Sequence, residues 1–131
     1  MEEYKYFMTI LVVDDSRLMR NIVKKHISDL NIECMYIEAE NGADAFNSVQ
    51  TNKIDLAVID WNMPKMSGIH LLKHIRDIEQ YQKLPIVMVT ANADRAHITE
   101  ALENGVTDYI IKPIDEKIFK KKLIRCINKI N

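Results

Sequence analysis

The chain has 131 residues, of which 47% are hydrophobic and 28% charged, with two cysteines and a formal net charge of −1. This length suits one domain with a full core, and the near-neutral charge excludes the strongly basic surface typical of nucleic-acid-binding proteins. The acidic first eight residues are unlike a signal peptide, no apolar run approaches the roughly 18 residues of a membrane span, and the cysteines are too few for a disulfide scaffold, so we expect a cytoplasmic protein.

Five short runs rich in Val and Ile predict β-strands, because such apolar runs are typical of strands buried on both faces. They lie at residues 8–13, 34–39, 54–59, 85–90 and 107–111. The intervening stretches indicate helices, with apolar residues three and four positions apart. The helical residues expected to face the core are Leu18, Met19, Ile22, Val23 and Ile27, then Leu71, Leu72, Ile75 and Ile78, and last Ile118, Phe119, Leu123, Ile127 and Ile130.

Capping residues agree with these elements. Asn41 and Gly42 mark the start of one helix, Gly105 marks the end of another, and Asp115 suits the N-cap of the last. Strand and helix therefore alternate five times, which predicts an α/β fold with one doubly wound parallel sheet covered by helices on both faces. In open sheets of this kind the functional site lies beyond the carboxyl ends of the strands.

Polar residues stand at the carboxyl ends of four predicted strands. Asp14 and Asp15 follow the first strand, Asp60 follows the third, Thr90 ends the fourth and Lys112 follows the fifth. Helix capping explains each of them alone. Together they form a chemically complementary set at one edge of the sheet, which indicates a functional site.

The charges suggest the chemistry of this site. Three neighbouring carboxylates repel one another unless a cation intervenes. Oxygen ligands without His or Cys favour Mg²⁺, which keeps open positions for substrate oxygens. With Lys112 as a second cation and Thr90 as a hydroxyl, the set suits a phosphoryl group, and we expect Asp60 to be the nucleophile that forms an aspartyl phosphate.

The chain resembles the receiver domain of two-component response regulators, and within that family the stand-alone chemotaxis regulators. The resemblance runs from about Thr9 to the last helix and depends on five motifs in order: LVVDDS (11–16), EAENG (38–42), DWNMPKMSG (60–68), VMVTAN (87–92) and YIIKP (109–113). It implies the flavodoxin-like strand order 2-1-3-4-5 with five helices. It also implies a single receiver domain over residues 1–131, with its core at about 9–130 and no output domain.

The resemblance assigns the phosphoacceptor and the metal site. Asp60 would accept the phosphoryl group. Asp15 would coordinate Mg²⁺ directly and Asp14 mainly through water, with Asp60 and the backbone carbonyl of Asn62 as further ligands, and Mn²⁺ could substitute. Lys112 would pair with the phosphate.

The resemblance also assigns the switch. The Thr90 hydroxyl and the Ala91 amide would bond the phosphoryl oxygens, and Tyr109 would turn into the space that Thr90 leaves. The peptide bond before Pro113 would be cis. Chemotaxis regulators often carry Glu where this chain has Asn92, and two positions tune the phosphate lifetime in the family: Asn62 and Asn92.

The partners follow from the same resemblance. A sensor histidine kinase or a histidine phosphotransfer domain would supply the phosphoryl group, and a phosphatase would remove it. A flagellar motor switch would read the phosphorylated state on the face formed by the fourth helix, fifth strand and fifth helix. We expect a monomer without nucleic-acid or membrane partners, and no enzyme activity beyond self-catalysed phosphoryl transfer and autodephosphorylation.

Four other functions would use some of the same residues. A phosphorelay intermediate would share every site residue, so the residues alone do not separate it from a chemotaxis regulator. A Mg²⁺-dependent phosphatase with an aspartyl nucleophile usually has two acids two residues apart after the first strand, whereas Asp14 and Asp15 are adjacent. An FMN-binding flavodoxin needs phosphate-binding donors in that loop, where these acids would repel a phosphate. A DNA-binding regulator would need more residues than the receiver leaves.

Two further signals favour an exposed surface. His70 and His74 have the i, i+4 spacing of a zinc site but lack a third ligand, so we interpret them as surface residues. The last helix is basic, with Lys120, Lys121 and Lys122 in a row. A solvated face explains this run, and we also expect it to meet an acidic patch on the output partner.

Overall fold

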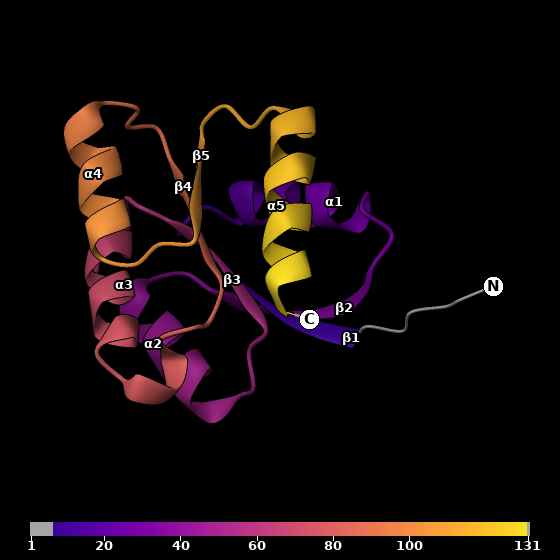
Figure 1. Ribbon diagram of the computed structural model, residues 1–131. Helices are drawn as coiled ribbons and strands as arrows, with labels where there is room; N and C mark the ends of the chain where they lie inside the picture. The colour runs from indigo at the N-terminus through magenta and orange to yellow at the C-terminus, as the bar shows by residue number, and fades with distance from the viewer. Residues whose placement is uncertain (1–6, 131) are drawn as a thin grey trace.

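The computed structural model describes residues 7–130, so the acidic start at residues 1–6, which argues against a signal peptide, lies outside the described residues. Strands and helices alternate along the whole of this range (Figure 1). In chain order the elements are β1 (Phe7–Val13), α1 (Arg17–Ser28), β2 (Glu33–Ala39), α2 (Gly42–Thr51), β3 (Leu56–Asp60), α3 (Gly68–Arg76), the 3₁₀ turn η1 (Glu79–Tyr81), β4 (Ile86–Thr90), α4 (Arg95–Glu103), β5 (Asp108–Ile111) and α5 (Glu116–Ile130).

The five strands form one parallel sheet in the order β2-β1-β3-β4-β5. This order and the five α-helices confirm the predicted doubly wound fold. The strand boundaries agree with the predictions to within two residues. Asp60 is the last residue of β3 and pairs in register with Val89 of β4, so the strand itself fixes the position of its carboxylate.

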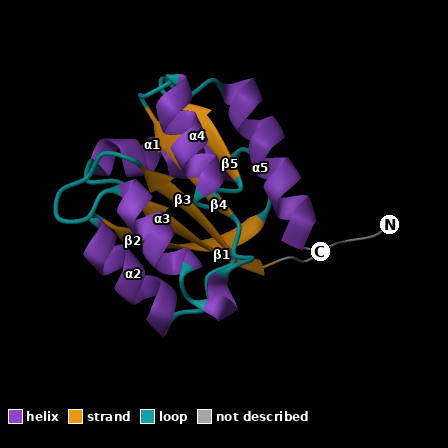
Figure 2. Cartoon of the chain, turned by 60° about the vertical axis from the view of Figure 1, so that its left-hand side comes forward, coloured by secondary structure: helices purple, strands orange, loops and turns teal. Residues whose placement is uncertain are grey.

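Helices cover both faces of the sheet, as Figures 1 and 2 show. One buried cluster contains residues of α2, α3 and α4, and the other contains residues of α1 and α5. β1, β3 and β4 contribute alternate side chains to both clusters. Ile10, Leu11, Leu56 and Ile59 are fully buried, which explains why these strands read as continuous apolar runs.

The helices begin at the expected capping residues. The Asn41 side chain accepts a hydrogen bond from the amide of Asp44 at 2.8 Å, and Asp115 accepts from the amides of Lys117 and Ile118 at 2.9 and 3.0 Å. These bonds satisfy amides that have no partner within the first turn of a helix. The predicted helix starts at Gly42 and after Asp115 are therefore confirmed.

Some predicted core residues are wrong. Leu18, Ile118 and Ile130 are 69%, 50% and 38% exposed, and Met19, Ile22 and Ile78 are only half-buried. The three exposed residues lie in the first or last turn of their helices. The 3₁₀ turn η1 was also not predicted. By contrast, His70 and His74 are exposed as expected, and Cys126 is buried as a small apolar residue.

Among residues 7–130, none of the helices combines the length and the apolar composition needed to cross a lipid bilayer.

Candidate functional site

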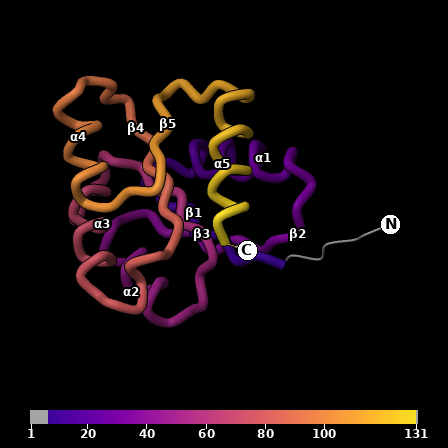
Figure 3. Tube along the Cα trace, viewed as in Figure 1, coloured from indigo at the N-terminus to yellow at the C-terminus, as the bar shows by residue number. Residues whose placement is uncertain are grey.

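The predicted site residues meet at the carboxyl edge of the sheet. Asp14 follows β1, Asp60 and Thr90 end β3 and β4, and Lys112 follows β5. The loops that leave β4 and β5 run along the upper edge of the molecule in Figure 3. Four strands thus bring together side chains that are as many as 98 positions apart in sequence, from Asp14 to Lys112.

Three carboxylates form the centre of the site. Asp14, Asp15 and Asp60 each offer an oxygen, and these atoms all lie within 4.8 Å of one another. Asp14 and Asp60 are 4% and 5% exposed, whereas Asp15 is exposed. The Asp14 carboxylate also accepts a hydrogen bond from the amide of Ser16 at 2.9 Å, which fixes its direction. An oxygen-only cluster of this size could hold one divalent metal ion.

Lys112 places an ammonium between two of these acids. Its Nζ lies 2.9 Å from Asp60 Oδ1 and 3.6 Å from Asp14 Oδ2. Its backbone amide donates to the carbonyl of Thr90 at 2.8 Å, and the following bond to Pro113 is cis. The hydrogen bond to Thr90 holds the Lys112 backbone at the end of β4, and its side chain reaches the acidic cluster.

The protonation equilibria reflect the excess of buried acid. Burial raises the pKa of Asp60; Lys112 opposes this effect and Asp14 adds to it. Burial also raises the pKa of Asp14, with a further contribution from Asp15. Burial disfavours the Lys112 ammonium, but the hydrogen bond to Asp60 and the charges of both acids outweigh it and raise the lysine pKa. Lys112 alone therefore does not compensate the buried carboxylates.

The remaining predicted residues border this cluster. Thr90 is buried, and its Oγ1 accepts a hydrogen bond from the amide of Asn92 at 2.9 Å. Asn62 and Ala91 are exposed in the loops that follow β3 and β4, so their backbone groups are close in sequence to Asp60 and Thr90.

Tyr109 lies on β5 and is half-buried. Together with Thr90 it lines a narrow space beneath α4 that has no room for a water-sized molecule. Lys122 of α5 lies 4.5 Å from the centre of the Tyr109 ring and donates to the Tyr109 carbonyl at 2.6 Å. β5 is thereby tied to α5 next to the site.

Residues 10–124 match the family model described as the response regulator receiver domain. The chain belongs to the response regulator receiver family. It is 40% identical to the chemotaxis protein CheY of Pseudomonas aeruginosa over 124 residues, covering 95% of this chain and 99% of that protein. It is 42% identical to the chemotaxis protein CheY-3 of Vibrio cholerae over 123 residues, covering 94% of each chain.

The receiver fold is also seen in a solved structure. The chemotaxis response regulator CheY4 of Vibrio cholerae superposes with a TM-score of 0.82 at 30% identity, covering 92% of this chain and 99% of that one. Receiver domains accept a phosphoryl group and transmit its presence to a target. The chain is therefore a phosphorylation-activated response regulator, a phosphoaccepting signalling protein that works between a histidine kinase and a downstream target.

The sequence patterns did not predict one residue of this receiver site. Arg20 of α1 is 8% exposed, and its Nη1 donates to the backbone carbonyl of Asp14 at 2.8 Å. Its Nε pairs with Glu38 at 2.8 Å, and Lys24 pairs with the other oxygen of that carboxylate. Hydrogen bonds from Lys24 and Arg20 lower the pKa of Glu38. The available signal was a cation three residues before Val23, on the buried side of the helix.

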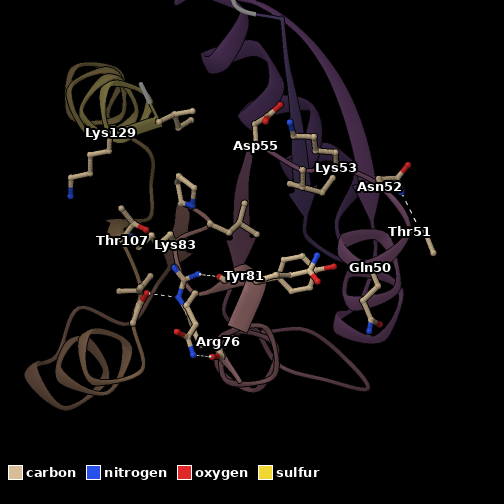
Figure 4. A pocket seen from close by; sticks show the side chains of 18 residues that line it. Gln50, Thr51, Asn52, Lys53, Asp55, Arg76, Tyr81, Lys83, Thr107 and Lys129 are labelled. Carbon is tan, nitrogen blue, oxygen red and sulfur yellow. Dashed lines mark hydrogen bonds between the residues drawn. The ribbon is translucent and has the colours of Figure 1, made fainter. Parts of the chain in front are cut away.

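A cavity of about 1110 Å³ lies at the opposite, amino-terminal edge of the sheet. Figure 4 shows Lys53 and Lys129 on different walls of this cavity, with their side chains apart. Arg76 donates to the backbone carbonyls of Tyr81 and Gly105 at 2.7 and 2.9 Å (Figure 4). The labelled cations do not converge on one point, so the acidic edge is the better candidate for chemistry.

Proposed function

We propose that Asp60 is the phosphoacceptor, and that it receives its phosphoryl group from a histidine kinase or a histidine phosphotransfer domain. The observation that carries this proposal is the pairing of a buried Asp60 with Lys112 beside two further acids. Asp60 is the last residue of β3, so the strand holds its carboxylate, and the neighbouring Asp15 is exposed to solvent. We further infer that residues 9–130 act as a single receiver domain.

The transfer is a substitution at phosphorus. A carboxylate oxygen of Asp60 attacks the phosphorus of a phosphohistidine, the new O–P bond forms, and the P–N bond breaks to return the electron pair to the imidazole. Lys112 is positioned to pair with the incoming phosphoryl oxygens. The Thr90 hydroxyl and the Ala91 amide supply further donors, which replace the water that a free phosphate would bind.

The acidic cluster fits Mg²⁺. Asp14, Asp15 and Asp60 offer only oxygen atoms, their mutual distances are short, and two of the three have a raised pKa because they are buried. With the carbonyl of Asn62 they would hold the ion and leave positions for water and phosphoryl oxygens. When bound, Mg²⁺ would neutralise charge on the transferring group, and Mn²⁺ could do the same.

We infer that the signal leaves through α4, β5 and α5. Thr90 and Tyr109 line the same space beneath α4, so a movement of the threonine toward a phosphate would make room for the ring. Several relatives are named chemotaxis proteins, which favours a flagellar motor switch as the target. Lys117, Lys120 and Lys121 of α5 are exposed and would meet an acidic patch on this target.

Mass spectrometry tests the acceptor. Incubation with acetyl phosphate and Mg²⁺ should add one phosphoryl group that maps to Asp60. The Asp60→Asn variant should show none, and Asp77→Asn, which removes an exposed acid at the end of α3, should behave as the wild type. Added mass on another residue, or none with either phosphodonor or kinase, would contradict the proposal.

Binding to a purified flagellar switch protein tests the output. Beryllofluoride, which mimics an aspartyl phosphate, should increase this binding, and the affinity should fall as salt rises because the contact is charged. Unchanged binding with beryllofluoride would argue against the motor switch while leaving the acceptor intact. The half-lives of phosphorylated Asn92→Glu and Asn62→Ala, each compared with that of the wild type, test the roles of these two residues in the phosphate lifetime.

A further inference from the structure

His97 of α4 contacts the residue that follows the phosphoacceptor. The centre of its imidazole lies 5.0 Å from that of the Trp61 ring, and the two planes meet at 68°. Trp61 is 7% exposed, and its backbone is tied to Val89 by its amide at 3.1 Å and to Gly68 by its carbonyl at 2.7 Å. The backbone is therefore fixed on both sides, and the position of the indole depends on the side chains that pack against it.

Asp94 holds the His97 ring in place. Its carboxylate caps α4 by accepting from the His97 amide at 3.3 Å, and its other oxygen lies 2.6 Å from His97 Nδ1. A carboxylate only accepts hydrogen bonds, so Nδ1 carries the proton and Nε2 is the atom at which the ring gains or loses charge. The contact is partly open to solvent, since the His97 and Asp94 side chains are 39% and 53% exposed.

His97 and Trp61 also wall the space beneath α4. This narrow space is lined by both rings and by Thr90 and Tyr109, the two residues of the inferred switch. A change in the position of the indole therefore changes the room available to the tyrosine. His97 therefore contacts Trp61, the neighbour of Asp60, and also borders the space that Thr90 and Tyr109 share.

We propose that His97 is a positioning residue of the phosphoacceptor site, and that the charge on its ring is coupled to the occupancy of Asp60. This inference rests on the proposed function of Asp60. The charged groups on α4 near the ring are Asp94 in the preceding turn and Glu100 in the following turn, where Glu100 pairs with Lys73 of α3 at 3.5 Å. Trp61 of the β3 loop is uncharged, and Tyr109 is the titratable group of β5 in the shared space.

The physical basis is a contact that differs between two states. A protonated imidazole attracts both the Asp94 carboxylate and the electron-rich indole, so it holds α4 against Trp61 more strongly than a neutral ring does. Phosphorylation adds negative charge at Asp60, next to Trp61, and this charge favours the protonated form of the ring. The charged ring and the occupied Asp60 therefore stabilise each other, and each alters the free energy of the other by an equal amount.

Trp61 is the only tryptophan in the chain, so its fluorescence reports this contact directly. Protonated imidazole quenches indole on contact more than neutral imidazole does. The emission should therefore rise between about pH 5.5 and about pH 8, across the range where histidine side chains change charge. His97→Asn should remove this change, and His70→Asn, which alters an exposed histidine of α3, should retain it.

Beryllofluoride then tests the coupling. In the wild type, with Mg²⁺ present throughout, the addition of saturating beryllofluoride should move the midpoint of the fluorescence change to higher pH. The ratio of beryllofluoride affinities at about pH 5.5 and about pH 8 should be about fivefold greater in the wild type than in His97→Asn. Asp94→Asn keeps a side chain suited to capping α4 but removes its charge, and should move the midpoint to lower pH.

The outcomes separate this inference from the proposed function. Equal affinity ratios in the wild type and His97→Asn, with binding still abolished by Asp60→Asn, would overturn the role of His97 alone. Absence of beryllofluoride binding in the wild type would overturn the phosphoacceptor assignment together with the coupling. A midpoint that beryllofluoride does not move would also refute the coupling.

Discussion

Asp14→Asn isolates the electrostatic cost of the acidic cluster. The amide is nearly the same size as the carboxylate, and its oxygen can still accept the hydrogen bond from Ser16. The substitution therefore removes a charge with little change in packing. In the metal-free protein we expect it to increase the free energy of unfolding.

The expected size follows from the distances. At an effective dielectric constant of about 20, two unit charges at the 4.8 Å limit of the cluster repel by about 3.5 kcal/mol, which applies to Asp14 and the buried Asp60, whereas solvent screens the repulsion from the exposed Asp15 to about 1 kcal/mol. The attraction to Lys112 at 3.6 Å is about 4.6 kcal/mol on the same scale. The two repulsions therefore nearly balance the attraction, and the expected gain of about 1 kcal/mol comes mainly from no longer burying the Asp14 charge, which is the largest cause of its raised pKa.

Urea melts with and without Mg²⁺ measure the effect. In chelator, Asp14→Asn should be about 1 kcal/mol more stable than the wild type. Saturating Mg²⁺ should stabilise the wild type more than the variant, because the variant has lost one ligand charge. Asp77→Asn is the matched control and should match the wild type in both conditions. If metal-free Asp14→Asn is as stable as the wild type or less so, the cluster is not under electrostatic strain.

Three further predictions follow from the same region. The pKa values of the Asp14 and Asp60 carboxyls are raised in the fold, so the folded chain binds the protons of these two acids more tightly than the unfolded chain does. The stabilisation from these protons is complete below the ordinary pKa of 3.8 and is lost as pH rises through the pKa values of the folded state. In metal-free urea melts the loss of stability as pH rises from 3.8 to neutral should therefore be greater in the wild type than in Asp60→Asn, and Mg²⁺ should reduce it; an equal loss in both chains would contradict the assignment. A Cβ on Gly68 would overlap the carbonyl oxygen of Asp60. Gly68→Ala should therefore lower the free energy of unfolding by about 3 kcal/mol in a thermal or urea melt, and a decrease below about 1 kcal/mol would show that the backbone shifts freely. Arg20→Met should leave the Asp14 carbonyl without its hydrogen-bond donor. The free energy of unfolding should fall by about 2 kcal/mol, and the Mg²⁺ affinity in a fluorescence titration should fall by about tenfold. Unchanged Mg²⁺ affinity would show that Arg20 does not support the metal site.

Much of the site could be predicted because its residues follow strands. A buried parallel strand is recognisable from its apolar run, and its carboxyl end is then known without reference to the rest of the chain. Asp60, Thr90 and Lys112 could be placed at one edge by that rule alone. The strand order came instead from the resemblance of the motifs, since apolar runs do not specify which strands are neighbours.

Contacts between side chains on different elements could not be predicted in this way. Periodicity treats a helix as uniformly covered, but Leu18 and Ile118 lie in the first turn of their helices and are exposed. Arg20 lies on the buried side of α1, yet only the packing of that helix beside β1 shows that its donor reaches the Asp14 carbonyl. Such contacts depend on where each helix crosses the sheet.

The sequence by itself determined the alternation of strands and helices, the acid at the end of β3 and the oxygen-rich chemistry around it. These features are local: each depends on residues within one strand or the loop that follows it. The tertiary structure decided which side chains meet across elements, including His97 with Trp61 and Lys112 with Asp60. The physical reason is that distances between residues far apart in sequence are set by the packing of whole elements, which local patterns do not specify.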